Sequence, residues 1–213
     1  MNVATDPWCK VCGITLVEDA LQAAEAGCDA LGFNFYPKSA RYIAPESASE
    51  ICAVLSEQYP NVRRVGLFVN AENTEVSSVL SKVDIDLLQF HGDENPAFCR
   101  QFSIPYIKVI GVTAATDVEA YERSYIEAWA LLLDTHDPQL KGGTGRAFDW
   151  SLWPTSSTKP LILAGGLTPE NVAQAIGETR PYGVDVAGGV ETVRKGVKDR
   201  AKVNLFVENA KHG

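Results

Sequence analysis

The chain has 213 residues, of which 46% are hydrophobic and 22% are charged. This composition is that of an average soluble globular domain, and it excludes a disordered or collagen-like chain. The 19 Lys and Arg against 27 Asp and Glu give a formal net charge of −8, which argues against binding to nucleic acid or an anionic membrane. No apolar run approaches the roughly 18 residues of a membrane span. The five scattered cysteines predict free thiols and a cytoplasmic protein.

Eight short apolar or β-branched runs recur along the chain, and most are followed by a segment with helical periodicity. The runs are nearly continuous in apolar character, which is typical of strands covered on both faces. Each start lies about one strand–helix unit after the previous one. The expected strands are Trp8–Cys12, Ala30–Phe35, Arg63–Asn70, Asp86–His91, Tyr106–Ile110, Ala128–Asp134, Pro160–Ala164 and Gly183–Ala187.

Eight such units, with no linker or composition break between them, predict an α/β fold in which residues 1–213 form one single-domain (β/α)8 barrel. The alternative is an open doubly wound sheet, which usually has five or six strands. The helix expected after the sixth strand is very short, around Asp149–Trp153, which weakens the count for a barrel slightly.

Several helix boundaries carry a local signal. Thr15 with Glu18 has the spacing of a capping box, and Gly27 is placed to end the helix that follows. Proline near a first helical turn costs no hydrogen bond, and it stands near three further expected helix starts, in Pro45-Glu46, Asn95-Pro96 and Thr168-Pro169-Glu170.

Side chains able to do chemistry stand at the ends of five expected strands. In a (β/α)8 barrel the active site lies at the carboxyl ends of the strands. Each residue alone has an ordinary interpretation as a small buried thiol or a turn residue. Together they place a thiol, two amides, an imidazole and a carboxylate around one mouth: Cys12, Asn34, Asn70, His91 and Asp134.

Glycine doublets follow the last two expected strands. The triplet Ala-Gly-Gly occurs at 164–166 and again at 187–189. The seventh and eighth loops of this fold often bind phosphate, and glycine lets backbone N–H groups approach it closely. Two ordinary turns remain the alternative. A third glycine cluster, at 141–146, follows Asp134 and is typical of a lid.

Two further charged groups are placed to matter. Lys38 and Arg41 are the cations of the expected second loop, and the Arg41 fork suits a carboxylate, with a solvated surface arginine as the alternative. Lys10 shares a strand face with Cys12, and Asp185 lies on the adjacent last strand of a closed barrel. If Lys10 and Asp185 pair, a buried cation would favour the Cys12 thiolate. A purely structural ion pair is the alternative.

The sequence resembles the phosphoribosylanthranilate isomerases of tryptophan biosynthesis. The similar segments follow the family order over nearly the whole chain, at 10–15, 32–43, 65–70, 89–92, 132–135, 142–145, 148–150 and 165–172. Two positions depart from the family. Ala187-Gly188 stands where the family usually has Ser-Ser, so a serine contact to phosphate is lost. Arg146 stands where Lys is common.

The resemblance implies an Amadori rearrangement of N-(5-phosphoribosyl)anthranilate to the 1-deoxyribulose 5-phosphate. It implies Cys12 as general base, Asp134 as general acid and Arg41 as the partner of the anthranilate carboxylate. The acid would need a raised pKa, from partial burial and a nearby phosphate, and the base a lowered one. Further substrate contacts fall on His91, Gly143, Gly165, Gly166, Gly188 and Gly189, with Lys10 and Asp185 in support.

The resemblance implies no metal and no other cofactor, and a small phosphorylated substrate handled by a monomer or homodimer. Two rivals remain. A metal-dependent sugar-phosphate epimerase would need His and Asp ligands in the mouth, but the chain has only three His. A non-catalytic phosphate binder would not need both Cys12 and Asp134.

Overall fold

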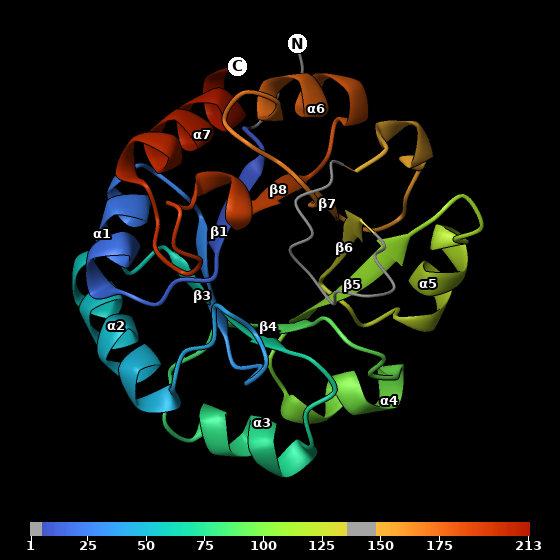
Figure 1. Ribbon diagram of the computed structural model, residues 1–213. Helices are drawn as coiled ribbons and strands as arrows, with labels where there is room; N and C mark the ends of the chain where they lie inside the picture. The colour runs from blue at the N-terminus through green and yellow to red at the C-terminus, as the bar shows by residue number, and fades with distance from the viewer. Residues whose placement is uncertain (1–5, 136–147) are drawn as a thin grey trace.

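The computed structural model describes residues 6–135 and 148–213. Eight parallel strands close into a barrel in chain order, and β8 pairs with β1 (Figure 1). The closed (β/α)8 barrel is therefore confirmed, and the open doubly wound sheet is excluded. The strands are β1 (Trp8–Cys12), β2 (Ala30–Asn34), β3 (Arg63–Phe68), β4 (Leu87–Phe90), β5 (Tyr106–Val112), β6 (Ala130–Thr135), β7 (Leu161–Leu163) and β8 (Gly183–Val186).

Helices surround the barrel as an outer ring (Figure 1). Between β6 and β7 the described chain forms only the 3-10 turn Trp150–Leu152, where a very short helix was expected. The α-helices are α1 (Val17–Glu25), α2 (Pro45–Gln58), α3 (Asn73–Leu80), α4 (Pro96–Cys99), α5 (Val118–Ser124), α6 (Val172–Thr179) and α7 (Arg200–His212).

Most predicted helix boundaries are confirmed. Pro45 and Pro96 occupy first-turn positions, and Gly27 follows α1 with a φ of 94°, a conformation that glycine adopts without strain.

Two predicted helix starts are wrong. The capping box of Thr15 and Glu18 is absent, because α1 begins at Val17 and the Thr15 hydroxyl donates instead to the Gly196 carbonyl. Helix α6 begins at Val172, so Thr168-Pro169-Glu170 forms the turn before that helix.

Alternate residues of the strands build two separate cores. Ala30, Val65, Leu87 and Ile107 belong to a cluster inside the barrel. Their neighbours along the strands belong to a larger cluster that includes the buried faces of the helices. Both faces of each strand are therefore covered, which explains the nearly continuous apolar runs.

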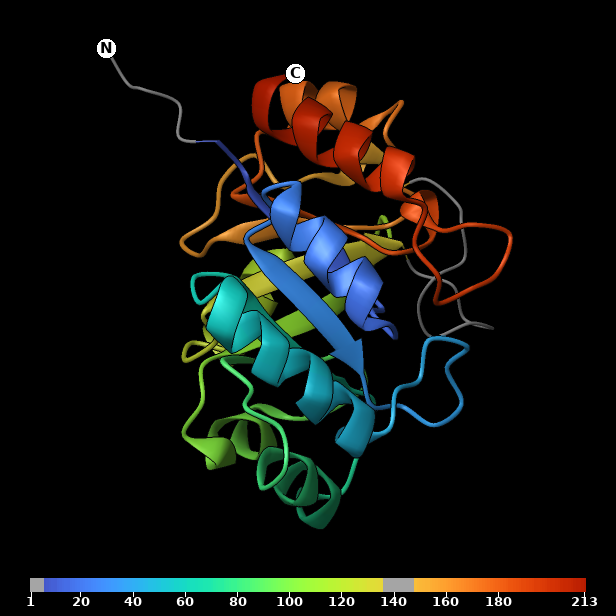
Figure 2. The same ribbon diagram turned by 90° about the vertical axis from the view of Figure 1, so that its left-hand side faces the viewer.

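Since all eight strands are parallel, their carboxyl ends open at one mouth. In Figure 2 the chain following β2 and the chain following β8 both extend from this end of the barrel. The inner face of β1 brings Lys10 and then Cys12 to the mouth.

Gly32 in β2 gives these two side chains their space. A Cβ at Gly32 would lie 2.6 Å from the Cys12 Sγ and 3.1 Å from the Lys10 Cε. We expect Gly32→Ala to lower the free energy of unfolding by about 1–3 kcal/mol, as overpacking does. Gly177→Ala in α6 is the matched control, because nothing lies within 4 Å of its Cβ position; it should stabilise by about 0.5–1 kcal/mol. Equal urea midpoints for the two variants would contradict this packing.

Candidate active site

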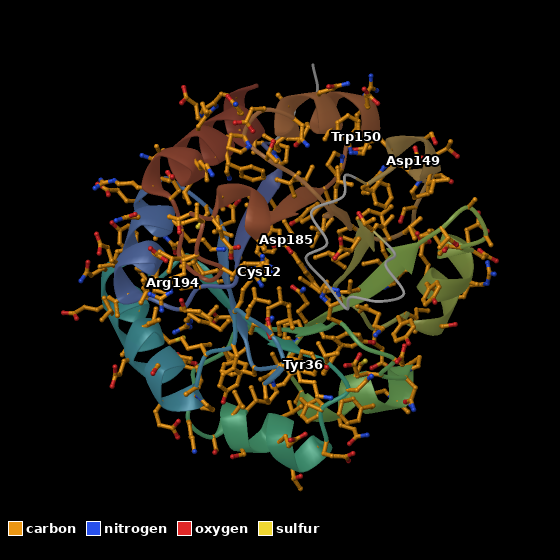
Figure 3. The ribbon with its side chains drawn as sticks, in the orientation of Figure 1. Cys12, Tyr36, Asp149, Trp150, Asp185 and Arg194 are labelled. Atoms are coloured by element: carbon orange, nitrogen blue, oxygen red, sulfur yellow. The ribbon has the colours of Figure 1, made fainter. Side chains whose placement is uncertain are left out.

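The structure brings the predicted thiol, imidazole and carboxylate to the mouth. Cys12 ends β1, His91 follows β4 directly and Asp134 is the penultimate residue of β6. Cys12 is 6% exposed, and Figure 3 shows it beside Asp185 near the centre of the barrel. The two predicted amides, Asn34 and Asn70, form hydrogen bonds within the loops instead. Asn34 shapes the loop after β2, accepting from the Tyr36 N–H at 2.9 Å and donating to the Ser39 hydroxyl at 3.0 Å.

The Asp134 carboxyl is harder to ionise than an ordinary aspartate. Burial raises its pKa from the ordinary 3.8 to about 6, with a further small rise from Asp185. The Thr135 N–H donates to its Oδ1 at 2.7 Å, which opposes the shift without cancelling it. The His91 Nε2 lies 3.6 Å from its Oδ2. Burial thus shifts the pKa of Asp134 in the direction that a general acid needs.

Cys12 stands above a buried ion pair. Lys10 and Asp185 are register partners on β1 and β8, and the Lys10 Nζ lies 2.8 Å from the Asp185 Oδ1. Burial acts to lower the pKa of Lys10, yet Asp185 and the Cys12 side chain together hold it above its ordinary value. The predicted pairing is present, and it puts a lasting positive charge beside the thiol.

Lys198 is a second buried cation next to Cys12. Its Nζ donates to the Cys12 carbonyl at 2.6 Å and to the Ala187 carbonyl at 3.1 Å, and it lies 3.3 Å from the Glu191 Oε1. Burial lowers the pKa of Lys198 despite the nearby Glu191. One ammonium thus joins the ends of β1 and β8 under the mouth.

Arg41 lies at the mouth, but its guanidinium forms a two-point ion pair with a carboxylate of the protein. Its Nε and Nη2 donate to the two Glu191 oxygens at 2.7 and 2.9 Å. The Arg41 side chain lies against Gly13, and its Nη2 is 3.2 Å from the position of a Cβ at Gly188. Lys38, the other cation of this loop, is exposed. Arg41 is therefore a fixed guanidinium beside Cys12 and the eighth loop.

The glycine doublets lie where backbone must approach closely. Gly165 has a φ of 86°, and a side chain there would collide with Thr135 and Asp134. A Cβ at Gly189 would collide with the Leu167 carbonyl, so the seventh and eighth loops touch at this point. Gly166 also has a positive φ, of 66°. Gly143, with the predicted lid at 141–146, lies outside the described residues.

Within residues 6–135 and 148–213, no group of three His, Cys, Asp or Glu side chains is placed to hold a metal ion. In the same described part of the chain, none of the helices is both long and apolar enough to cross a membrane.

Comparison with known proteins agrees with this geometry. The family model for N-(5'phosphoribosyl)anthranilate (PRA) isomerase matches residues 9–209. The chain belongs to this family. It is 54% identical to the N-(5'-phosphoribosyl)anthranilate isomerase of Pseudomonas fluorescens over 198 residues, covering 93% of this chain and 95% of the relative.

Solved structures of the family superpose closely on the barrel. Phosphoribosyl anthranilate isomerase from Thermotoga maritima has a TM-score of 0.85 and 44% identity, covering 96% of this chain and 98% of that one. An isomerase of the family in complex with reduced 1-(o-carboxyphenylamino)-1-deoxyribulose 5-phosphate has a TM-score of 0.79 and 41% identity, with the same coverage. The chain is thus an isomerase of tryptophan biosynthesis. It converts N-(5'-phosphoribosyl)anthranilate, a phosphorylated small molecule, to 1-(2-carboxyphenylamino)-1-deoxyribulose 5-phosphate.

Sequence reasoning missed the partners that hold the site. Glu191 and Lys198 follow β8, and neither stands at a strand end, so nothing marked them as members of the mouth. One signal was available elsewhere. Lys108 interrupts the apolar strand Tyr106–Val112 and is buried there, and a charge inside such a run needs a buried partner.

The raised pKa of Asp134 has a cost in stability, because the native state binds a proton that the unfolded chain releases. Between about pH 4 and pH 6 the free energy of unfolding falls as pH rises, and above pH 6 the loss is complete. We therefore expect Asp134→Asn to raise the free energy of unfolding above pH 6 by about 2–3 kcal/mol. This gain should shrink as pH falls through 6 and vanish below about 4.

Urea unfolding of the parent and the variant from pH 4 to 8 measures this difference. The exposed carboxyl of Glu208 gives a matched control, since Glu208→Gln should stay within about 0.5 kcal/mol at every pH. An Asp134→Asn difference that does not change with pH would refute the shifted pKa.

Proposed function

We propose that Cys12 and Asp134 carry the rearrangement as general base and general acid. Asp134 gives its proton to the ribose ring oxygen, the C1–O bond breaks, and the ring opens to a protonated Schiff base. Cys12 then takes the C2 proton, and the electron pair of that C–H bond moves to neutralise the iminium nitrogen. The resulting enolamine tautomerises to the ketose amine.

The observation that supports this division of roles most directly is the buried Asp134 with its pKa of about 6. A carboxyl with an ordinary pKa would hold almost no proton near neutral pH, whereas this one holds a useful fraction. Cys12 has cationic neighbours instead, because Lys10 and Lys198 both interact electrostatically with its side chain. Acid and base come from β6 and β1, which are not neighbours in the barrel, so a ribose between them is accessible to both.

For the aromatic end of the substrate, we propose that Arg41 attracts the anthranilate carboxylate while Glu191 keeps its guanidinium in place. Glu191 accepts from Nε and Nη2, so the substrate carboxylate would bind the remaining N–H groups of the guanidinium. His91, beside Asp134, is the proposed polar contact on the opposite side of the mouth.

For the phosphate, the backbone N–H groups of the two glycine doublets are the proposed ligands: Gly165, Gly166, Gly188 and Gly189. Gly143 is proposed as a further contact from the sixth loop. The chain has Ala187-Gly188 where the family usually has two serines, so this phosphate site depends on backbone donors, which glycine leaves accessible.

The remaining proposals concern the protein as a whole. Residues 1–213 act as one catalytic domain in the cytoplasm, as a monomer or homodimer. The Lys10–Asp185 pair supports the thiol, and the reaction as written needs no metal or redox cofactor, because each step moves only protons and an electron pair.

The two catalytic assignments are tested by replacing the reacting groups. Cys12→Ala and Asp134→Asn should each reduce turnover by at least ~10², measured as the loss of substrate anthranilate fluorescence. Cys52→Ala, which removes a buried thiol in α2, is the matched control and should keep turnover within a few-fold. A catalytic variant that kept turnover within a few-fold of the parent would disprove the role given to that residue.

Arg41 should affect binding more than turnover. A lysine offers one point charge in place of the fork, so Arg41→Lys should raise KM by about 10- to 100-fold, the value of a charge-assisted hydrogen bond. Lys38→Ala on the same loop is exposed and should leave KM within about twofold. Steady-state kinetics measure both, and equal KM values for the two variants would contradict the role of Arg41.

A further inference from the structure

Another buried ion pair lies behind the opposite side of the mouth. The Lys108 Nζ is 2.9 Å from the Glu94 Oε2, and the two side chains are 3% and 2% exposed. Lys108 comes from β5, and Glu94 from the loop between β4 and α4. A buried pair of this kind costs desolvation energy and is often no more stabilising than apolar residues of similar volume. Its contacts therefore indicate what it does.

Those contacts go to the backbone on both sides of His91. Glu94 accepts from the Gly92 N–H at 2.9 Å, and Lys108 donates to the Gly92 carbonyl at 2.6 Å and the Phe90 carbonyl at 3.4 Å. The His91 N–H itself donates to the Phe68 carbonyl at 2.9 Å. The backbone at 90–92 is thus fixed at four polar groups, three of them by this one ion pair.

The Glu94 carboxylate also accepts a hydrogen bond from the loop after β3. Glu94 accepts from the Asn70 N–H at 2.7 Å, and the Asn70 side-chain oxygen accepts from the Asp93 N–H at 2.6 Å. Asn70 has a φ of 50°, a left-handed conformation that asparagine tolerates better than most residues. Gly92 packs so closely on Asn70 that a Cβ would collide with it. The loops after β3 and β4 are therefore joined by hydrogen bonds and close packing.

We propose that Glu94 and Lys108 are positioning residues for the isomerisation, and that they act through His91. By fixing the backbone on both sides of this histidine they set its ring against Asp134, 3.6 Å away. Neither residue touches the substrate. The proposal rests on the roles given above to His91 and Asp134.

A double-mutant cycle separates positioning from general structural support. Glu94→Gln keeps the shape of the side chain but removes its charge, and it should lower kcat by about 10- to 100-fold, because small misplacements at an active site have effects of this size. In a His91→Gln background the same substitution should lower kcat by less than about twofold. If it costs the same factor in both backgrounds, the positioning role is overturned.

Two further variants keep the test decisive. If Glu94→Gln does not fold, the double variant Glu94→Gln with Lys108→Met removes both charges together and carries the same expectation. Tyr125→Phe is the matched control. It removes the hydrogen bond from the Tyr125 hydroxyl to the Glu94 carbonyl at 2.8 Å but leaves the contacts at 90–92, so it should lower Tm and leave kcat within about twofold.

An NMR readout is independent of turnover. The His91 ring signals, assigned by their loss in His91→Gln, should shift in Glu94→Gln and stay in place in Tyr125→Phe; unmoved signals in Glu94→Gln would overturn the proposal. Unchanged kcat and KM in His91→Gln alone would instead refute the role of His91 in the reaction, and this proposal with it. If His91→Gln does lower activity but Glu94→Gln costs the same factor in both backgrounds, only the positioning role of Glu94 and Lys108 is refuted, and the role of His91 in the reaction stands.

Discussion

A charge that the barrel buries must be paired or lose its ionised form, and the mouth of this protein is organised by that constraint. Three lysines are almost fully buried in the described chain beside the mouth: Lys10, Lys108 and Lys198. Each lies within 3.3 Å of a carboxylate oxygen. Asp134 is treated differently, because burial is the largest influence on it and raises its pKa to about 6.

The paired lysines therefore support the backbone of the mouth, whereas Asp134 is left able to exchange a proton. Two of the three lysines also donate to backbone carbonyls: Lys198 to those of Cys12 and Ala187, and Lys108 to those of Phe90 and Gly92. Lys198 with Glu191 therefore supports the side of the mouth that carries the thiol, and Lys108 with Glu94 supports the side that carries His91. Among the described residues the Asp134 carboxyl has no such lysine partner, and its raised pKa leaves part of the population protonated near neutral pH.

Much of the fold could be predicted from the sequence, because strand burial and loop chemistry are local signals. Eight apolar runs marked the eight strands. Side-chain alternation on the first and last strands, together with barrel closure, gave the conditional prediction that Lys10 pairs with Asp185, and the pair is present. Helix starts were harder, because tertiary contacts compete with local caps. Thr15 has the spacing of a cap, yet its hydroxyl is used by Gly196, 181 residues away in the chain.

The residues proposed to react could be predicted from the sequence, whereas the ion pairs that hold the surrounding loops could not. Cys12, His91 and Asp134 stand at strand ends, where chain position alone places them at the mouth. The capture of the Arg41 fork by Glu191 depends on how the second and eighth loops meet, 150 residues apart. The pairing of Glu94 with Lys108 depends likewise on the path of the loop after β4. No spacing rule contains that information.

Burial leaves part of the Asp134 population protonated near neutral pH, which lets this carboxyl act as the acid. Carbon-13 NMR of the parent with labelled aspartate carboxyls measures this directly, with the Asp134 signal assigned by its loss in Asp134→Asn. We expect a titration midpoint near 6. A midpoint at or below the ordinary value of 3.8 would contradict it, because the carboxyl would then be ionised in the mouth and the acid would have to be another group.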